Sequence, residues 1–352
     1  MQYSRLGDTG LIVSRLAFGT MTFGSAPNTP FAAVHKVDQA AANDLVARAL
    51  DAGINFFNTA DVYASGDAER MLGRALGARR KEVVIATKGG NRMGEGLIET
   101  GLSRRHLIGA AEESLKRLGT DFIDVYLVHK VDQLTPLEET LGALEDLVRQ
   151  GKVRYVGFSN WPAWRAATAV GVQRARGFAQ FRAAEMYYSL LGRDVEHEVV
   201  PFCLDAGVGI TVWSPLAGGF LSGKYTRSQP KGQSGDRLGG FDPLPYDRER
   251  AFEVLELVRA IGEKHGVSPA QVAIAWLLTR PGVASVLIGA SNATQLEDNL
   301  GAARLRLTDE DLAELDEATK PTPLYPNWFT DLAADSRAHN ALGVPLKVKP
   351  LR

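Results

Sequence analysis

The chain has 352 residues, with 40 basic and 41 acidic side chains and a formal net charge of -1. This near-neutral balance gives no electrostatic footprint for nucleic acid or for an anionic membrane surface, so we expect neither as a partner. A single cysteine, Cys203, excludes a disulfide framework and a cysteine-rich zinc site. The sequence contains no run of about 18 apolar residues, the length needed to span a membrane. Residues 1–5 lack the apolar core of a signal peptide. We therefore expect a cytoplasmic protein.

Short apolar, β-branched runs alternate along the chain with longer segments that have the spacing of amphipathic helices. We expect strands at residues 16–21, 55–60, 83–88, 123–129, 154–159, 178–188, 209–214 and 285–289. We expect helices at residues 38–52, 67–79, 103–119, 138–151, 162–176, 196–207, 248–280 and 293–301. Strands and helices in alternation favour a parallel sheet with crossover helices, and eight such units are typical of a (β/α)8 TIM barrel. The prediction is an α/β protein whose residues 1–352 form a single barrel domain.

Three segments lie outside this repeat. Residues 1–15 contain two short apolar stretches around Gly7-Asp8-Thr9-Gly10, which predicts an N-terminal β-hairpin at the bottom of the barrel. Residues 217–247 have no periodicity, and so long a loop inside a compact domain is usually functional. Residues 319–352 are predicted to form an irregular tail over one face. We expect aromatic side chains of this tail to wall an apolar pocket, namely Tyr325, Trp328 and Phe329.

Polar side chains end several of the predicted strands, at the edge where such a barrel carries its chemistry. Lys88 directly follows the apolar residues 83–87, in a partly dry setting where an ammonium group needs a partner. His129 ends the strand at 123–129, although a lone histidine there is more often a satisfied core residue. Together with Tyr63, these residues fit proton donation. They supply a phenol, an ammonium that lowers the pKa of the phenol, and an imidazole that orients a carbonyl.

The sequence resembles the aldo-keto reductase family over nearly the whole chain. The segments that carry the resemblance occur in order at residues 5–7 with 16–21, then 55–63, 86–88, 124–129, 157–160, 213–219 and 289–292. The chain is most similar to the bacterial branch of this family that also resembles the β subunit of voltage-gated potassium channels. The resemblance implies NADPH-dependent reduction of an aldehyde or ketone to its alcohol. The pocket composition then suggests bulky or aromatic carbonyl substrates.

The resemblance also implies a role for single residues. Tyr63 is expected to be the general acid, Lys88 to lower the pKa of Tyr63, and His129 to position the carbonyl oxygen. Cofactor contacts at the nicotinamide end are expected from Gly19, Thr20, Met21, Ser159, Asn160, Glu185 and Trp213. The pyrophosphate is expected along Ser214, Pro215, Leu216, Ala217 and Gly218, and the adenosine near Gly289, Ser291, Gln295, Asp298 and Asn299. Lys224 and Arg237, from the loop at 217–247, are expected near the adenosine phosphate.

Two positions depart from the family pattern. Asn58 stands where the family has an aspartate five residues before the tyrosine, and Glu185 stands where it usually has glutamine. Without the aspartate, we expect Lys88 to lose its charged partner and to release its proton more readily, which would weaken turnover and make Asn58→Asp a gain of function. For Glu185 two interpretations stay open: it accepts from the carboxamide of the cofactor, or it pairs with Arg182.

A cofactor-binding regulatory or sensor module with little turnover is the main alternative, favoured by the channel-subunit resemblance and by the missing acid. Tyr126 and Lys130 have the Tyr-x-x-x-Lys spacing of short-chain dehydrogenases, but no Gly-x-Gly-x-x-Gly fingerprint accompanies them, which argues against a Rossmann fold. The six histidines have no ligand spacing, so we expect no metal site.

Overall fold

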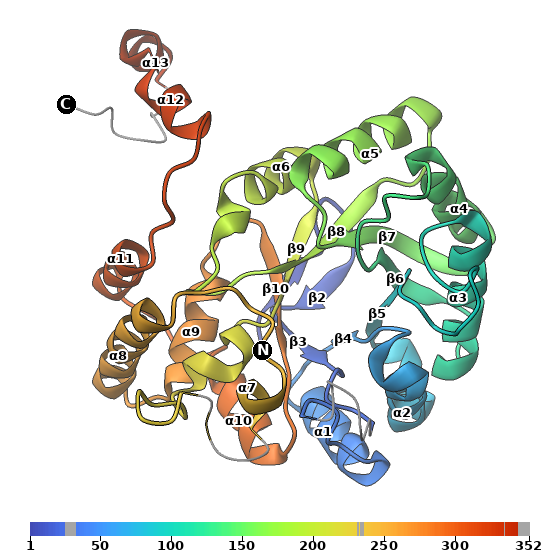
Figure 1. Cartoon of the computed structure of the whole chain (residues 1–352), viewed down its shortest axis with the longest axis horizontal. Coiled ribbons are helices and arrows are strands. Elements are labelled where there is room, and N and C mark those ends of the chain that lie inside the picture. The colour runs from blue at the N-terminus through green and yellow to red at the C-terminus, as the bar shows by residue number, and fades with distance from the viewer. Residues whose placement is uncertain (25–32, 231, 233–235, 334, 344–352) are drawn as a thin grey trace.

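The centre of the molecule is a closed barrel of parallel strands (Figure 1). A computed structural model describes the chain apart from residues 25–32, 231, 233–235, 334 and 344–352. The barrel strands are β3 (Leu16–Gly19), β4 (Phe56–Asn58), β5 (Val84–Gly89), β6 (Ile123–Val128), β7 (Val153–Ser159), β8 (Phe181–Tyr187), β9 (Gly209–Trp213) and β10 (Val283–Ile288). Each strand pairs in parallel with the next, and β10 pairs with β3 to close the ring. The predicted TIM barrel is confirmed.

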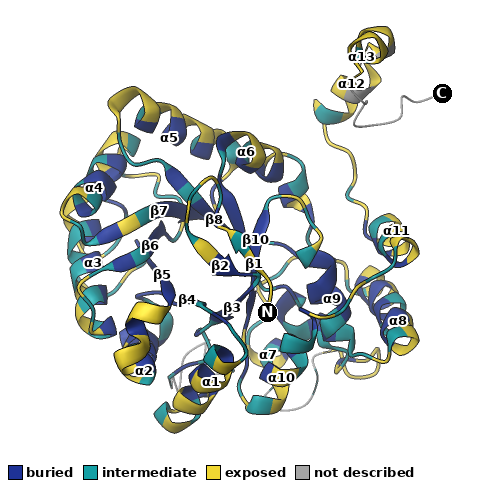
Figure 2. Cartoon of the chain, turned by 180° about the vertical axis from the view of Figure 1, so that it is seen from behind, coloured by how far each residue is buried: buried dark blue, intermediate teal, exposed yellow. Residues whose placement is uncertain are grey.

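Alternation along each strand divides the core into two layers, because successive side chains of a strand point to opposite faces. In β6, for example, Val125 and Leu127 face the barrel interior, whereas Tyr126 and Val128 pack against the helices. Both faces of the strands are therefore apolar, as in other parallel sheets covered on both sides. Figure 2 shows the buried strands at the centre and the exposed residues on the outer faces of the helices.

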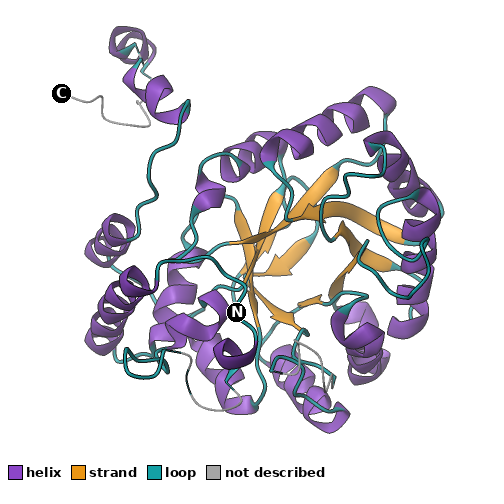
Figure 3. Cartoon of the chain, in the orientation of Figure 1, coloured by secondary structure: helices purple, strands orange, loops and turns teal. Residues whose placement is uncertain are grey.

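Helices surround the strands on the outside (Figure 3). They are α1 (Gln39–Asp51), α2 (Asp67–Leu76), α3 (Arg104–Leu118), α4 (Leu137–Arg149), α5 (Ala163–Arg176), α6 (Val199–Ala206), α8 (Arg248–His265), α9 (Pro269–Leu278) and α10 (Ala293–Gly301). Local signals set their ends: Ser103 caps α3 through its hydroxyl, and Gly119 ends this helix with a positive φ of 64°. No helix in the described part of the chain has both the length and the apolar character needed to cross a membrane.

An N-terminal hairpin closes the end of the barrel where the strands begin. Strands β1 (Tyr3–Arg5) and β2 (Ile12–Ser14) pair antiparallel, as the sequence predicts. Leu6 and Val13 belong to the apolar cluster inside the barrel. A side chain at Gly7 would lie 2.6 Å from the backbone oxygen of Gly207, so only glycine allows this close approach. The opposite end, where the strands finish, is left for the site.

Two predictions about the second half of the chain are corrected. The single helix predicted at 248–280 is wrong: α8 ends at Gly266, which has a φ of 65°, and Ser268 caps a new helix that starts with Pro269. Glycine after a helix and proline in the first turn are ordinary stop and start signals. The loop at 217–247 contains a 3₁₀ helix (Ala217–Ser222) and the short α7 (Arg237–Gly240).

The C-terminal tail contains more helix than the sequence suggests. Helix α11 (Asp309–Ala318) precedes it, and α12 (Asn327–Leu332) and α13 (Ser336–Leu342) lie within it. Figure 1 shows α12 and α13 standing off from the barrel wall. The three tail aromatics contact one another and are 43–74% exposed. The expectation that they wall a pocket is therefore not met in this structure.

Candidate active site

The structure brings four residues together at the carboxyl ends of the strands: two predicted catalytic residues and the two residues that differ from the family pattern. Asn58 ends β4, Lys88 lies near the end of β5, and Glu185 lies in β8 on the far side of the ring. Tyr63 begins a 3₁₀ helix (Tyr63–Gly66) after β4. Asn58, Lys88 and Glu185 are at most 2% exposed, so their polar groups must satisfy one another.

Lys88 is the centre of this cluster. Its Nζ donates to Asn58 Oδ1 at 2.7 Å and to the backbone oxygen of Thr59 at 2.8 Å. It also donates to Tyr63 Oη at 3.3 Å and lies 3.1 Å from Glu185 Oε1. Burial alone would lower the pKa of Lys88, but the charge of Glu185, helped by Tyr63, outweighs it and holds that pKa above its ordinary value. Lys88 is therefore an ammonium at neutral pH.

The expectation that Lys88 lacks a charged partner is wrong. Asn58 Nδ2 donates to Glu185 Oε2 at 2.6 Å, so the Asn58 amide bridges the lysine and the glutamate. The proposed Glu185–Arg182 pair is also absent, because Arg182 lies near Gly207 at the other end of β8. β4 and β8 face each other across the ring, and this contact across the barrel is not visible in the order of residues along the chain.

Tyr63 and His129 are positioned as a proton donor and a neutral imidazole. Burial raises the pKa of Tyr63 above its ordinary value, although the charge of Lys88 acts in the opposite direction. Burial, with the charges of Lys88 and Lys130, lowers the pKa of His129 to about 3. The two rings meet edge to face, with centroids 6.0 Å apart. At neutral pH the phenol thus keeps its proton and the imidazole carries no charge.

Asn91 is a site residue that the sequence prediction missed. Its Nδ2 donates to His129 Nδ1 at 2.8 Å. Nδ1 must then be the acceptor, which leaves the proton of the neutral ring on Nε2. Asn91 lies just after β5, preceded by two glycines. A polar residue at the end of a strand is the sequence signal that could have identified it.

Residues expected at the nicotinamide end lie together at the ends of β7 and β9. Asn160 Oδ1 accepts from Trp213 Nε1 at 3.0 Å, and Asn160 Nδ2 donates to Ser159 Oγ at 2.9 Å. Ser159 Oγ in turn donates to the backbone oxygen of Glu185 at 2.9 Å. Thr20, just after β3, has a buried hydroxyl without a partner among the described residues, and its backbone nitrogen donates to the backbone oxygen of Asn58.

Backbone strain is concentrated at the same end of the barrel. Among the described residues, those other than glycine with a positive φ are Ala64, Ser65, Asn160, Ser214 and Ala217. All of them lie in the loops that follow β4, β7 or β9. Such conformations cost about 1–3 kcal/mol each and cluster at functional sites. The turn expected to line a pyrophosphate is built this way, with Ser214 Oγ accepting from the backbone nitrogen of Gly218 at 2.8 Å.

The residues expected near the adenosine gather at the start of α10, with one exception. Gln295 Oε1 accepts from the Ser291 backbone nitrogen at 2.9 Å, and Asn299 Nδ2 donates to the Gly289 backbone oxygen at 3.2 Å. A side chain at Gly289 would meet no atom of the described residues within 4 Å, so these residues leave open space here. The carboxylate of Asp298 instead accepts hydrogen bonds from α9, which turns it away from this group.

Two cations of the long loop differ in their partners. Lys224 Nζ pairs with Asp236 Oδ1 at 2.8 Å. Arg237 Nε is buried without a hydrogen-bond partner among the described residues. A buried guanidinium donor without a partner is costly, and an anion would satisfy it. The buried Arg237 donor and the open space at Gly289 are each compatible with a dinucleotide carrying phosphate groups.

Comparison with known proteins assigns the chain to a family. A model of the Aldo/keto reductase family matches residues 15–320, which is most of the chain. The chain belongs to this family. Membership makes the protein an oxidoreductase and agrees with the strand-end residues of the site.

Relatives in the aldo/keto reductase family match nearly end to end. The chain is 33% identical over 348 residues to a versiconal hemiacetal acetate reductase of Aspergillus parasiticus, covering 93% of this chain and 99% of that protein. It is 35% identical over 342 residues to a probable voltage-gated potassium channel subunit beta of Arabidopsis thaliana, covering 94% and 100%. It is 37% identical over 338 residues to an uncharacterized oxidoreductase of Bacillus subtilis (strain 168), covering 90% and 95%.

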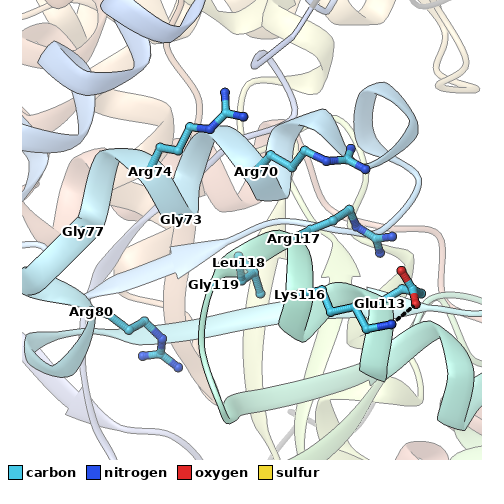
Figure 4. A pocket seen from close by; sticks show the side chains of 10 residues that line it. All are labelled: Arg70, Gly73, Arg74, Gly77, Arg80, Glu113, Lys116, Arg117, Leu118 and Gly119. Carbon is cyan, nitrogen blue, oxygen red and sulfur yellow. Dashed lines mark hydrogen bonds and ion pairs between the residues drawn. The ribbon is translucent and has the colours of Figure 1, made fainter.

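A cavity of about 580 Å³ lies away from the aldo/keto reductase site, between α2 and α3 on the outer wall (Figure 4). Its basic lining residues are Arg70, Arg74, Arg80, Lys116 and Arg117. Four of these already have carboxylate partners: Arg70 with Asp67 at 3.0 Å, Arg80 with Asp124 at 2.7 Å, Lys116 with Glu113 at 2.6 Å and Arg117 with Glu69 at 2.6 Å. The cavity contains none of the predicted site residues and is separate from the proton-donating group.

Proposed function

We propose that this aldo/keto reductase interconverts an aldehyde or ketone and its alcohol with NADP(H) as the cofactor. The observation that carries the proposal is the contact of the buried Lys88 ammonium with the Tyr63 hydroxyl, beside a neutral His129. A protonated phenol, a fixed positive charge and a neutral N–H donor are what reduction of a carbonyl requires from the protein.

The roles of the residues follow from their protonation states. In reduction, Tyr63 Oη gives its proton to the carbonyl oxygen of the substrate. Lys88 stabilises the negative charge that develops on Tyr63 Oη, because its ammonium already donates to that oxygen. His129 Nε2 donates a hydrogen bond to the same carbonyl oxygen and fixes its position. The nicotinamide, when bound, supplies the hydride.

Cofactor binding is proposed along the ends of β7, β9 and β10. Ser159 and Asn160 would hold the carboxamide, and Trp213 would stack on the ring. The strained turn at Ser214–Gly218 and the start of α10 would take the phosphates, because both present backbone N–H groups. Lys224 and Arg237, whose Nε has no hydrogen-bond partner among the described residues, favour NADPH over NADH, since NADPH carries one more phosphate.

A regulatory or sensor module with little turnover is the second candidate. What favours it is the similarity to proteins named as potassium channel β subunits. Its other support, a missing acid beside Lys88, is lost because Glu185 supplies a carboxylate at 3.1 Å. The reductase is therefore the better supported proposal.

Steady-state NADPH oxidation with a panel of aliphatic and aromatic aldehydes tests the proposal. We expect turnover with at least one aldehyde, and Tyr63→Phe should lower kcat by about 10²-fold or more. NADPH affinity should stay within about threefold, since no phosphate contact changes. Tyr126→Phe is the matched control, because Tyr126 is a buried tyrosine that packs on the outer side of β6. Tight NADPH binding without turnover on any aldehyde would favour the sensor.

A further inference from the structure

The carboxylate beside the catalytic lysine comes from an unexpected strand. We propose that Glu185 is the acid that positions Lys88 for the proposed reduction, presented from β8 across the barrel, with Asn58 as its amide bridge on β4. The inference rests on the proposed function. It assigns Glu185 a positioning role that acts through Lys88 on the proton of Tyr63.

The hydrogen bonds of Asn58 show why the two positions belong together. The Asn58 amide presents its oxygen to Lys88 Nζ at 2.7 Å and its nitrogen to Glu185 Oε2 at 2.6 Å. An amide can accept from the ammonium through its oxygen and donate to the carboxylate through its nitrogen at the same time, whereas an ionised aspartate can only accept. The three side chains therefore form a neutral set of one ammonium, one carboxylate and one amide, with every contact of matched polarity.

Glu185 is the carboxylate in contact with the Lys88 ammonium. Asp61 is also buried nearby, but its pKa is raised to about 7 by burial and by Glu69, and its oxygens have no hydrogen-bond partner among the described residues. The other groups that act on the pair are Tyr63 and His129, and neither carries a negative charge at neutral pH. Glu185 thus supplies the charge that keeps the buried Lys88 an ammonium.

The two ends of the Glu185 residue serve different groups. Its carboxylate faces Lys88 and Asn58, whereas its backbone oxygen accepts from Ser159 Oγ at 2.9 Å and from the Asn160 backbone nitrogen at 3.2 Å. The cofactor-side pair is therefore held by the main chain of β8. Replacing the Glu185 side chain should disturb Lys88 while leaving this pair in place.

Exchanging the positions of the carboxylate and the amide tests the inference. Glu185→Gln removes the carboxylate, and we expect kcat for aldehyde reduction to fall about 10- to 100-fold. The basic limb of the pH–rate profile should move to lower pH, because Lys88 then loses its proton more easily. The double variant Asn58→Asp/Glu185→Gln returns one carboxylate and one amide to the cluster. It should restore kcat to within about fivefold and return the basic limb toward its original pH.

A matched control separates this role from a structural one. Glu145→Gln removes another buried carboxylate, one that pairs with Arg149 at 2.6 Å on the outer wall. It should leave both kcat and the pH profile unchanged. If Glu185 is merely structural, Glu185→Gln lowers the unfolding midpoint without moving the basic limb, and the double variant does not rescue turnover.

A readout without turnover keeps the inference separable from the proposed function. Lysine labelled with ¹³C at Cε reports the titration of Lys88 by NMR, with Lys88→Met to assign its signal. We expect the pKa of Lys88 in the wild type to lie above that of an ordinary lysine. In Glu185→Gln we expect the pKa of Lys88 to be lower than in the wild type. A wild-type Lys88 that titrates below an ordinary lysine overturns the inference even if the variant does not fold. If Lys88 titrates as expected but no carbonyl compound is reduced, only the proposed function is overturned.

Discussion

Asn58→Asp gives the sharpest test of the charge balance at the barrel mouth. From the sequence alone this change restores a missing acid and raises turnover. In the structure it places a second carboxylate where the Asn58 amide nitrogen now lies 2.6 Å from Glu185 Oε2. The buried cluster would then hold two negative charges and one positive charge.

The Coulomb energies show that a second carboxylate gains no net electrostatic stabilisation. At an effective dielectric constant of about 20, two like charges at the 2.6 Å of this contact repel by about 6 kcal/mol. Attraction to Lys88 at the present 2.7 Å contact is also about 6 kcal/mol, so the two terms cancel. Desolvation of the new carboxylate remains, and an uncompensated buried charge costs about 3–5 kcal/mol. The variant therefore keeps one extra proton in the native state.

The sign of the pH dependence follows from this proton. A carboxyl group whose pKa is raised in the native state binds more protons there than in the unfolded chain, so stability falls as pH rises. We expect Asn58→Asp to match the wild type near pH 4 and to lose about 3–5 kcal/mol of unfolding free energy by about pH 9. Turnover should not rise at any pH.

Urea unfolding of both proteins across this pH range, with parallel aldehyde reduction assays, measures the effect. The double variant Asn58→Asp/Glu185→Gln is the control, because its aspartate faces an amide and the pH-dependent loss should disappear. An Asn58→Asp protein that is as stable as the wild type at high pH, or faster than it, would refute the reasoning.

Three further predictions concern single side chains. Asn91→Ala frees His129 Nδ1 and allows the other tautomer, so kcat should fall about tenfold; ¹⁵N NMR of the imidazole should show mixed tautomers, and an unchanged Nε2–H form contradicts the assignment. Lys224→Ala should raise KM for NADPH more than for NADH, and equal effects in steady-state kinetics would exclude a role for Lys224 at the additional phosphate. The raised pKa of Asp61, about 7, means that the wild type loses stability as pH rises from about 4 to 7, by about 1.4 kcal/mol per unit of pKa shift. Asp61→Asn should be more stable than the wild type above that range in urea unfolding, and parallel curves for the two proteins would disprove the burial of a charge there.

The barrel is determined by local patterns, and the sequence is enough to predict it. Eight apolar runs separated by helical segments specify the strands and their order, because consecutive parallel strands need a crossover between them. Glycine and proline set element ends, as at Gly119, and the error at 248–280 came from overlooking Gly266 and Pro269. The positions of Lys88 and His129 at strand ends, and of Tyr63 after β4, were predictable for the same reason.

Partnership across the barrel was decided only by the tertiary structure. Asn58 and Glu185 are separated by 127 residues and lie on strands at opposite sides of the ring. Each looks like an isolated departure from the family pattern when read along the chain. Closure of the barrel brings them to 2.6 Å, and the low polarity of the interior makes a charged partner for Lys88 obligatory. Strand closure thus joins two separate departures from the family pattern in one hydrogen-bonded cluster around Lys88.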